Sequence, residues 1–237
     1  MPLDASDGCL VSRLGLVEYG AAWDAQRRLV EACRADGVAR LLLLEHPPTY
    51  TFGPRGRAEH LLASKASLAA KGAAVHRVDR GGDVTFHGPG QLVGYPVLDL
   101  RRWREGPVWY VCSLEAALIE ALVTFGIRGE RAPKRPGVWV GGEKIAAIGV
   151  RVSRGITSHG FALNVDPDLS WFSHIVPCGL ADVTVTSMAQ VLGGPPSMRE
   201  VTDAVVRAFG RVFGIDMIDA GWGEPLNTPS DVPIEVR

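Results

Sequence analysis

The sequence predicts an α+β domain in which helices flank a mixed β-sheet. Short β-type segments cluster at residues 75–98 and 138–165, and tight Gly and Pro turns connect several of them, which favours antiparallel pairing. Segments with helical periodicity stand before, between and after these two clusters. A regular alternation of single strands with helices would instead predict a doubly wound parallel sheet, so we favour the mixed sheet.

In the first half of the chain, two helices separate the predicted strands. Apolar residues such as Leu29 recur at helical spacing over 18–36, and Gly37 ends this helix. A second helix is predicted over 61–71, where Gly72 stops it. The strands predicted in this half are 9–17, 38–44, 49–52, 75–78, 84–86 and 92–98.

The second half is predicted to hold a β-hairpin and a further strand between two long helices. The helix over 107–125 begins with proline, which suits the first turn of a helix. The helix over 197–213 begins at Ser197, and Glu200 completes a capping box with it. The strands predicted here are 138–140, 144–152 and 156–165, the first two joined by a Gly-Gly turn.

Length and composition predict one large domain. The chain has 237 residues, of which 46% are hydrophobic and 22% charged, as in ordinary globular proteins. We expect a single domain over residues 1–219 and a flexible tail over 220–237, where Gly, Pro and Asp accumulate. A net charge of −1 provides no global basic field, so neither nucleic acid nor a membrane surface is an expected partner.

The cysteine pattern predicts a reducing, cytoplasmic setting. Scattered cysteines cannot build a disulfide framework, and neither C-x-x-C nor H-E-x-x-H occurs, so we expect no metal site. We identify no signal peptide, and the longest aliphatic run, Leu41 to Leu44, is far too short to cross a bilayer. The cysteines are Cys9, Cys33, Cys112 and Cys178.

A glycine-rich segment over 80–91 is the first candidate binding element. Five of its twelve residues are Gly or Pro, and Arg80 and His87 stand among them. Glycine lets backbone N–H groups approach a bound group closely, but a pair of tight turns between strands explains the composition equally well. The segment has neither the Rossmann nor the Walker A pattern, so it does not predict a nucleotide site.

Lys144 and Cys178 are the candidate reactive residues. Lys144 is one of only four lysines and ends an otherwise apolar strand face, so its ammonium group either reaches solvent or has a chemical role. Cys178 stands in a Pro-Cys-Gly loop, whereas Cys33 and Cys112 fall in predicted helices and are expected to be buried. Together Lys144 and Cys178 suggest a thiol activated by a basic amine. A histidine partner stays open as an alternative.

Small residues line one face of two consecutive predicted strands. Ala147 and Gly149 alternate on the first strand, opposite the face of Lys144. Ser158, Gly160 and Ala162 alternate on the second. Two such stripes on neighbouring strands fit either a close contact with a helix or a channel for a thin aliphatic chain.

Four motifs in order carry a family resemblance. They are Arg80-Gly81-Gly82-x-x-Thr85-Phe86-His87-x-x-Gly90-Gln91-x-Val93-x-Tyr95, Glu143 to Arg151, His159 to Asn164 and Val176 to Gly179. Flanking matches at His46-Pro47-Pro48-x-Tyr50-Thr51-x-Gly53 and Gly137-Val138-Trp139 extend the similarity over residues 40–190. In these motifs the chain resembles the octanoyltransferases of lipoate biosynthesis, the lipoyl(octanoyl) transferase family.

The resemblance implies a fold, a reaction and its partners. The fold would be the catalytic domain shared with biotin and lipoate protein ligases, and residues 1–219 would form this acyltransferase domain. The reaction would move an octanoyl group from acyl carrier protein to a lysine of a lipoyl domain. Such domains belong to the 2-oxoacid dehydrogenase complexes and to the glycine cleavage H protein. Neither a metal nor another cofactor is implied.

The resemblance also implies roles for individual residues. Cys178 would be the nucleophile that carries the acyl group as a thioester, and Lys144 would lower the pKa of its thiol. The residues that would bind the acyl substrate are Arg80, Gly81, Gly82, Asp83, Val84, Thr85, Phe86, His87, Ala147, Ile148, Gly149, Gly160, Phe161 and Ala162. These residues form three segments, 80–87, 147–149 and 160–162. The second and third segments contain residues of the small-residue stripes, so the family resemblance and the strand pattern indicate the same binding site.

Two competing hypotheses fit the same sequence features. An ATP-dependent lipoate or biotin protein ligase on the same fold would adenylate its substrate, and Cys178 would then be a bystander. A non-catalytic acyl-binding protein would use Cys178 only structurally. A requirement for ATP identifies the first alternative, and failure to form a covalent adduct identifies the second.

Overall fold

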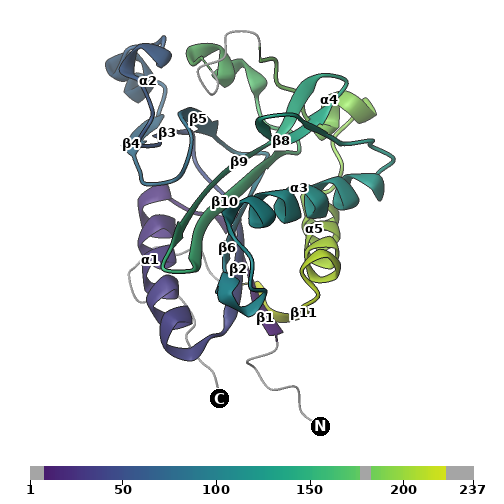
Figure 1. The fold of residues 1–237 in the computed structure, drawn as a ribbon. Helices are drawn as coiled ribbons and strands as arrows, with labels where there is room; N and C mark the ends of the chain where they lie inside the picture. Colours follow the sequence, from purple (N-terminus) through teal and green to yellow (C-terminus); the bar gives the residue numbers. More distant parts are fainter. Residues whose placement is uncertain (1–7, 177–182, 223–237) are drawn as a thin grey trace.

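The computed structural model describes residues 8–176 and 183–222, which form two β-sheets with helices packed against them (Figure 1). The eight described strands of the larger sheet are, in spatial order, β11 (Asp216–Trp222), β1 (Gly8–Leu16), β2 (Ala39–Glu45), β6 (Gln91–Val97), β10 (Ile156–Asn164), β9 (Glu143–Ser153), β8 (Arg135–Val140) and β7 (Glu130–Ala132). The smaller sheet contains β4 (Ala74–Arg77), β3 (Thr49–Phe52) and β5 (Val84–His87). Parallel pairs at β1 and antiparallel pairs from β2 to β7 confirm the predicted α+β fold with a mixed sheet.

Helices cover both faces of the larger sheet. The α-helices are α1 (Tyr19–Asp36), α2 (Lys65–Ala70), α3 (Pro107–Val123), α4 (Met188–Leu192) and α5 (Met198–Phe213). Figure 1 shows α1 on one face, with α3 and α5 side by side on the other. Leu41 and Leu43 of β2 pack in the α3 and α5 core, whereas Leu42 and Leu44 pack with Leu29 of α1. The unbroken leucine run is therefore a central strand that is buried on both faces.

The helix ends follow the sequence signals, with one exception. Gly37 ends α1 at a φ of 72°, and its N–H donates to the carbonyl oxygen of Cys33. Ser197 takes the N-cap position of α5, and its carbonyl accepts from the N–H of Val201. Its side chain makes no capping hydrogen bond, so the capping box predicted with Glu200 is wrong.

The helix predicted over 61–71 is wrong in its first half. In the structure α2 begins only after Ser64, whose hydroxyl accepts from the N–H of Ser67 at 3.1 Å. Leu61 instead forms a β-bridge with Ile175, and the N–H of Leu62 donates to the carbonyl of His174 at 2.8 Å. Because these long-range bonds need extended backbone, tertiary pairing overrides the local helical preference here.

Several elements of the structure were not predicted from the sequence. One of them, β11, extends the folded region past the predicted end of the domain. Strand β11 pairs in parallel with β1, with Cys9 opposite Met217. The predicted end of the domain at residue 219 therefore lies inside a strand, while residues 223–237 lie outside the described residues. The short elements β7 and α4 were also missed, as were the 3-10 helices Ala58–His60, Leu100–Arg102 and Leu169–His174. In the described part of the chain, no helix is long and apolar enough to cross a membrane.

Candidate active site

The candidate site lies where the hairpin of β9 and β10 meets the glycine-rich segment. Gly149 pairs with Gly160, and Ala147 pairs with Ala162, so the two small-residue stripes lie directly side by side. The N–H of Gly81 donates to the carbonyl of Val150 at 2.9 Å, which holds the glycine-rich segment against β9. Between the hairpin and the glycine-rich segment is a cavity. Its volume is about 530 Å³, which includes the space at its open mouth.

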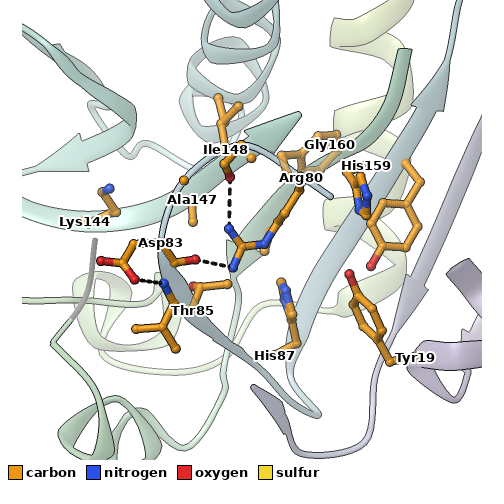
Figure 2. Close-up of a pocket in the computed structure, with 17 residues that line it drawn as sticks. Tyr19, Arg80, Asp83, Thr85, His87, Lys144, Ala147, Ile148, His159 and Gly160 are labelled. Carbon is orange, nitrogen blue, oxygen red and sulfur yellow. Dashed lines mark hydrogen bonds between the residues drawn. The ribbon is translucent and has the colours of Figure 1, made fainter. Parts of the chain in front are cut away.

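The cavity brings together the predicted substrate-binding segments (Figure 2). Its lining includes Arg80, Gly81, Gly82, Asp83, Val84, Thr85, His87, Ala147, Ile148, Gly149, Gly160, Phe161 and Ala162. Phe86 is the exception among the predicted residues. Its ring does not line the cavity but packs in the core under the smaller sheet, where it stacks on Trp171 with ring centroids 5.4 Å apart.

The two glycines of the hairpin are required for different reasons. A Cβ atom at Gly149 would lie 3.0 Å from the carbonyl oxygen of Gly81 and 3.1 Å from Cδ of Arg80. A Cβ atom at Gly160 would lie 2.1 Å from the carbonyl oxygen of Gly94 on β6. The missing side chain at Gly149 thus lets the loop at residues 80 and 81, which covers the cavity, approach β9 closely. The missing side chain at Gly160 lets β6 approach β10 closely. Neither close contact is made with a helix.

Arg80 holds the glycine-rich segment in shape. Its side chain is buried, and its guanidinium group donates to the carbonyl oxygens of Thr51 at 2.6 Å and of Asp83 at 2.7 Å. Nε of Arg80 donates to Oγ1 of Thr51 at 3.1 Å. Because one planar group binds both β3 and the turn at Asp83, it fixes the roof of the cavity relative to the smaller sheet.

Lys144 is buried at one end of the cavity, so its side chain does not simply extend into solvent. Its Nζ donates to the carbonyl of Pro136 at 3.2 Å and lies 4.8 Å from the ring centroid of Trp139. Its backbone N–H donates to the carbonyl of Thr184, and its carbonyl accepts from the N–H of Thr186. The chain that follows position 182 is thus hydrogen-bonded directly to Lys144.

A second, wider cavity adjoins the first at Lys144, with a volume of about 1150 Å³ that again includes the space at its open mouth. The two share Gly81, Gly82, Asp83, Ile148 and Gly149 as well as Lys144. Arg55, Lys134 and Arg135 add basic side chains to the lining of the wider cavity. Lys144 therefore stands at the junction of a narrow cavity and a wide one.

The cysteines differ in ways that the sequence only partly predicted. Cys178 lies outside the described residues. Cys9 and Cys33 are buried, and burial raises the pKa of their thiols to about 12 and about 11, so neither is a ready nucleophile. Cys112 is exposed, contrary to the prediction, because it stands away from the buried stripe of α3 that includes Tyr110 and Leu114.

Three residues at the other end of the cavity were missed as site residues. Tyr19, Tyr95 and His159 line it together with His87. Tyr95 and His159 stand within the recognised motifs and could have been proposed from them. Tyr19 could not, because it begins α1, far from any motif, and only the packing of α1 against the sheet brings it here.

His159 is held in an unusual backbone conformation by polar contacts. Its φ is 56°, and its N–H donates to Oε1 of Gln26 at 2.7 Å. Its Nε2 lies 2.8 Å from Oδ1 of Asp79, whose other oxygen binds Arg151. The hydrogen bond from His159 lowers the pKa of Asp79 to about 2, so this carboxylate stays ionised and orients the imidazole ring.

Within residues 8–176 and 183–222, no group of three or more His, Cys, Asp or Glu side chains is placed to hold a metal ion.

Comparison with known proteins identifies the family. The chain matches the lipoyl protein ligase A/B catalytic domain over residues 18–210. It is 50% identical over 209 residues to an octanoyltransferase of Gloeobacter violaceus, which covers 87% of this chain and 91% of that one. The length and the identity of this match confirm the resemblance predicted from the motifs.

Solved structures share the fold at lower identity. A lipoate-protein ligase A bound with ATP has a TM-score of 0.75 at 18% identity and covers 90% of this chain and 88% of that one. A bipartite lipoate protein ligase studied with its E2 lipoyl domain, from Thermoplasma acidophilum, has a TM-score of 0.73 at 18% identity and covers 90% and 86%. The chain therefore belongs to the lipoyl protein ligase A/B catalytic domain family, among the octanoyltransferases, which are acyl-transferring enzymes.

Proposed function

We propose that this enzyme transfers an octanoyl group from acyl carrier protein to a lysine of a lipoyl domain, through a thioester on Cys178. Octanoyl transfer is the activity for which its relatives are named. The observation that carries the mechanism is the position of Lys144, buried where the narrow cavity meets the wide one. The narrow cavity suits an acyl chain, and the wide one suits the approach of two protein substrates in turn.

The first half-reaction forms the acyl-enzyme. Lys144 accepts the proton of the Cys178 thiol, and the resulting ammonium group stabilises the thiolate. The thiolate attacks the carbonyl carbon of the carrier thioester, and the bond between that carbon and the carrier sulfur breaks. The departing carrier thiolate takes the proton back from Lys144. One thioester replaces another of similar energy, so this step needs no ATP.

The second half-reaction forms the amide. The amine of the lipoyl-domain lysine attacks the thioester carbonyl carbon, and the Cys178 thiolate departs as the amide bond forms. The proton lost by the attacking amine passes to Lys144, which delivers it to the Cys178 thiolate and so regenerates the thiol. Backbone N–H groups of the glycine-rich segment, or near it, would stabilise the oxyanion in both half-reactions.

The same proposal assigns the remaining roles. The segments 80–87, 147–149 and 160–162 bind the octanoyl chain, with Phe86 supporting β5 from its other side. The acceptors are lipoyl domains of 2-oxoacid dehydrogenase complexes and the glycine cleavage H protein, in the cytoplasm. The acceptor class is supported by the related fold of a ligase studied with its E2 lipoyl domain.

Intact-mass spectrometry tests the proposal. The protein is mixed with octanoyl-acyl carrier protein without ATP, and lipoyl domain is then added. We expect a protein mass increased by one octanoyl group, which disappears as the lipoyl domain gains it. Modification only with free octanoate and ATP would instead identify a ligase. Binding of the acyl carrier with no adduct and no transfer would identify a non-catalytic acyl-binding protein.

A further inference from the structure

Four aromatic and imidazole rings line the narrow cavity at the side away from Lys144. In Figure 2, Lys144 lies at one side of the lining residues, and Tyr19 and His159 lie at the other. With His87 and Tyr95 they form what we call the end wall, defined as Tyr19, His87, Tyr95 and His159. An acyl chain whose carbonyl lies near Lys144 would therefore direct its methyl end toward this wall.

The end wall is rigid because each ring is fixed by a partner. Tyr19 is 1% exposed, and its ring stacks on the imidazole of His87 with centroids 6.0 Å apart. The hydroxyl of Tyr95 lies 2.7 Å from Nε2 of His46, whose Nδ1 is 2.6 Å from the carbonyl oxygen of Val17. Since these contacts tie the wall to the backbone of the core, the rings cannot readily turn aside for a longer ligand.

Hydrogen bonds also hold His87 and His159, although Nδ1 of His159 is buried without a hydrogen-bond partner among the described residues. Nδ1 of His87 lies 2.8 Å from Oε1 of Gln91, whose amide nitrogen donates to Oδ1 of Asn164 at 2.9 Å. His159 is held by Asp79, as described above. Burial lowers the pKa of His87 to about 3 and raises the pKa of Tyr19 to about 12, so both rings stay neutral.

We propose that this end wall, and Tyr19 above all, sets the maximum acyl chain length that the enzyme accepts. The proposal rests on the function proposed above. Along the cavity, Ala147 and Ala162 leave room for methylene groups, whereas the wall presents phenol and imidazole rings in fixed positions. A chain longer than the cavity must either displace these rings or bury methylenes against hydroxyl groups that lose hydrogen-bonding partners, and both are unfavourable.

A competition experiment tests this proposal. Wild type and Tyr19→Phe are each given an equimolar mixture of hexanoyl-, octanoyl-, decanoyl- and dodecanoyl-acyl carrier proteins with lipoyl domain. The masses of the acylated lipoyl domain then give the relative kcat/KM for each chain. Decanoyl is longer than octanoyl by two methylenes, and the space freed by one hydroxyl group accommodates about one of them. We therefore expect Tyr19→Phe to raise the ratio of decanoyl to octanoyl product about fourfold, because burying one further methylene contributes about 0.8 kcal/mol.

Tyr50→Phe is the matched control. It also removes a buried tyrosine hydroxyl, one that donates to the carbonyl of Trp171 in the smaller sheet, outside the cavity lining. This variant should keep the wild-type chain-length profile. If Tyr19→Phe does not fold, Tyr95→Phe replaces it, because it removes the other hydroxyl of the wall.

The outcomes separate this proposal from the proposed function. A wild-type profile in a folded Tyr19→Phe or Tyr95→Phe protein would overturn the end-wall assignment while leaving octanoyl transfer intact. An equal shift in Tyr50→Phe would also overturn it, since the effect would then be general loosening. Absence of transfer by wild type at every chain length would instead count against the proposed function itself.

Discussion

Cys178 and Cys112 offer a matched pair of single-residue tests. We expect Cys178→Ala to abolish both the octanoyl adduct and transfer, because the thioester can then no longer form. Cys112→Ala should retain full activity and stability within about 0.5 kcal/mol, because Cys112 is exposed on α3. Intact mass after incubation with octanoyl-acyl carrier protein measures both. An adduct on the Cys178→Ala protein would contradict the assignment of the nucleophile.

Lys144 can act as a fixed positive charge, as a proton acceptor, or as both. Arginine keeps the charge but does not release its proton near neutral pH, so Lys144→Arg should keep part of the thiolate stabilisation and lose proton transfer. The rate of alkylation of Cys178 by iodoacetamide, followed against pH, reports the thiolate. We expect a midpoint below the value of about 8.5 for free cysteine in wild type, the highest midpoint in Lys144→Ala, and an intermediate one in Lys144→Arg.

A common midpoint in all three proteins would show that Lys144 does not tune the thiol. His159 and His87 would then become the residues to substitute, since both line the same cavity. Turnover by both lysine variants should be low in either case.

His46 links stability to pH. Burial lowers its pKa from 6.5 to about 4 in the folded protein. Between these two values the unfolded chain binds more protons than the folded one, so the free energy of unfolding decreases as the pH falls from about 6.5 to about 4. His87, with a pKa lowered to about 3, acts in the same direction.

Urea denaturation at several pH values measures this effect. We expect His46→Gln to be less stable than wild type near neutral pH but to lose stability less steeply below pH 6.5, by on the order of 1 kcal/mol per pH unit. Identical slopes for the two proteins would show that His46 does not contribute to acid sensitivity.

For single residues, the sequence predicts which residues take part in the site but not which way their side chains face. The motifs predicted nearly every residue that lines the cavity, because glycines and polar residues at fixed spacing are visible in the sequence. The outward position of Cys112 depends on the rotation of α3 about its axis, which an almost uniformly apolar helix does not specify. The place of Tyr19 depends on how α1 packs, which no local pattern contains.

Among the secondary-structure elements, the β9–β10 hairpin is the one where a single substitution should change the free energy of unfolding most clearly. Gly160→Ala would put a methyl group 2.1 Å from the carbonyl oxygen of Gly94, so β10 and β6 would have to separate. We expect a loss of more than about 3 kcal/mol in the free energy of unfolding, measured by chemical denaturation. Gly20→Ala is the control, because a Cβ there meets no atom within 4 Å and the helix should gain about 0.5 kcal/mol. Equal stabilities of the two variants would contradict the close approach of the strands.

Elements were predictable where their pattern is local. The leucine strand β2, the hairpin strands β9 and β10 and the long helices α1, α3 and α5 follow from periodicity and from their glycine or proline boundaries. The first turn predicted for α2 is lost to pairing with residues 174 and 175, and β11 exists because it pairs with a strand near the other end of the chain. Neither partner is near enough in sequence to leave a local signal.

For the whole molecule, β11 determines where the folded domain can end. It completes the sheet beside β1, and Asp219 binds the buried Arg13 at 2.7 Å. A chain ending after Ile215 loses these bonds, and we expect its thermal midpoint to fall by roughly 5 °C or more. A chain ending after Trp222 should keep the wild-type midpoint and activity. Differential scanning calorimetry of both truncations measures this, and equal midpoints would show that β11 is dispensable.

The pairing of β1 with β11 also has a consequence for folding during synthesis on the ribosome. At about 5–20 residues per second, synthesis of this chain takes roughly 10 to 50 s. β1 emerges first and can pair with β2 early, but its other edge stays open until β11 has left the exit tunnel. During that interval the nascent chain has an unpaired strand edge. Such an edge can pair with a strand of another chain and lead to aggregation, and chaperones bind it.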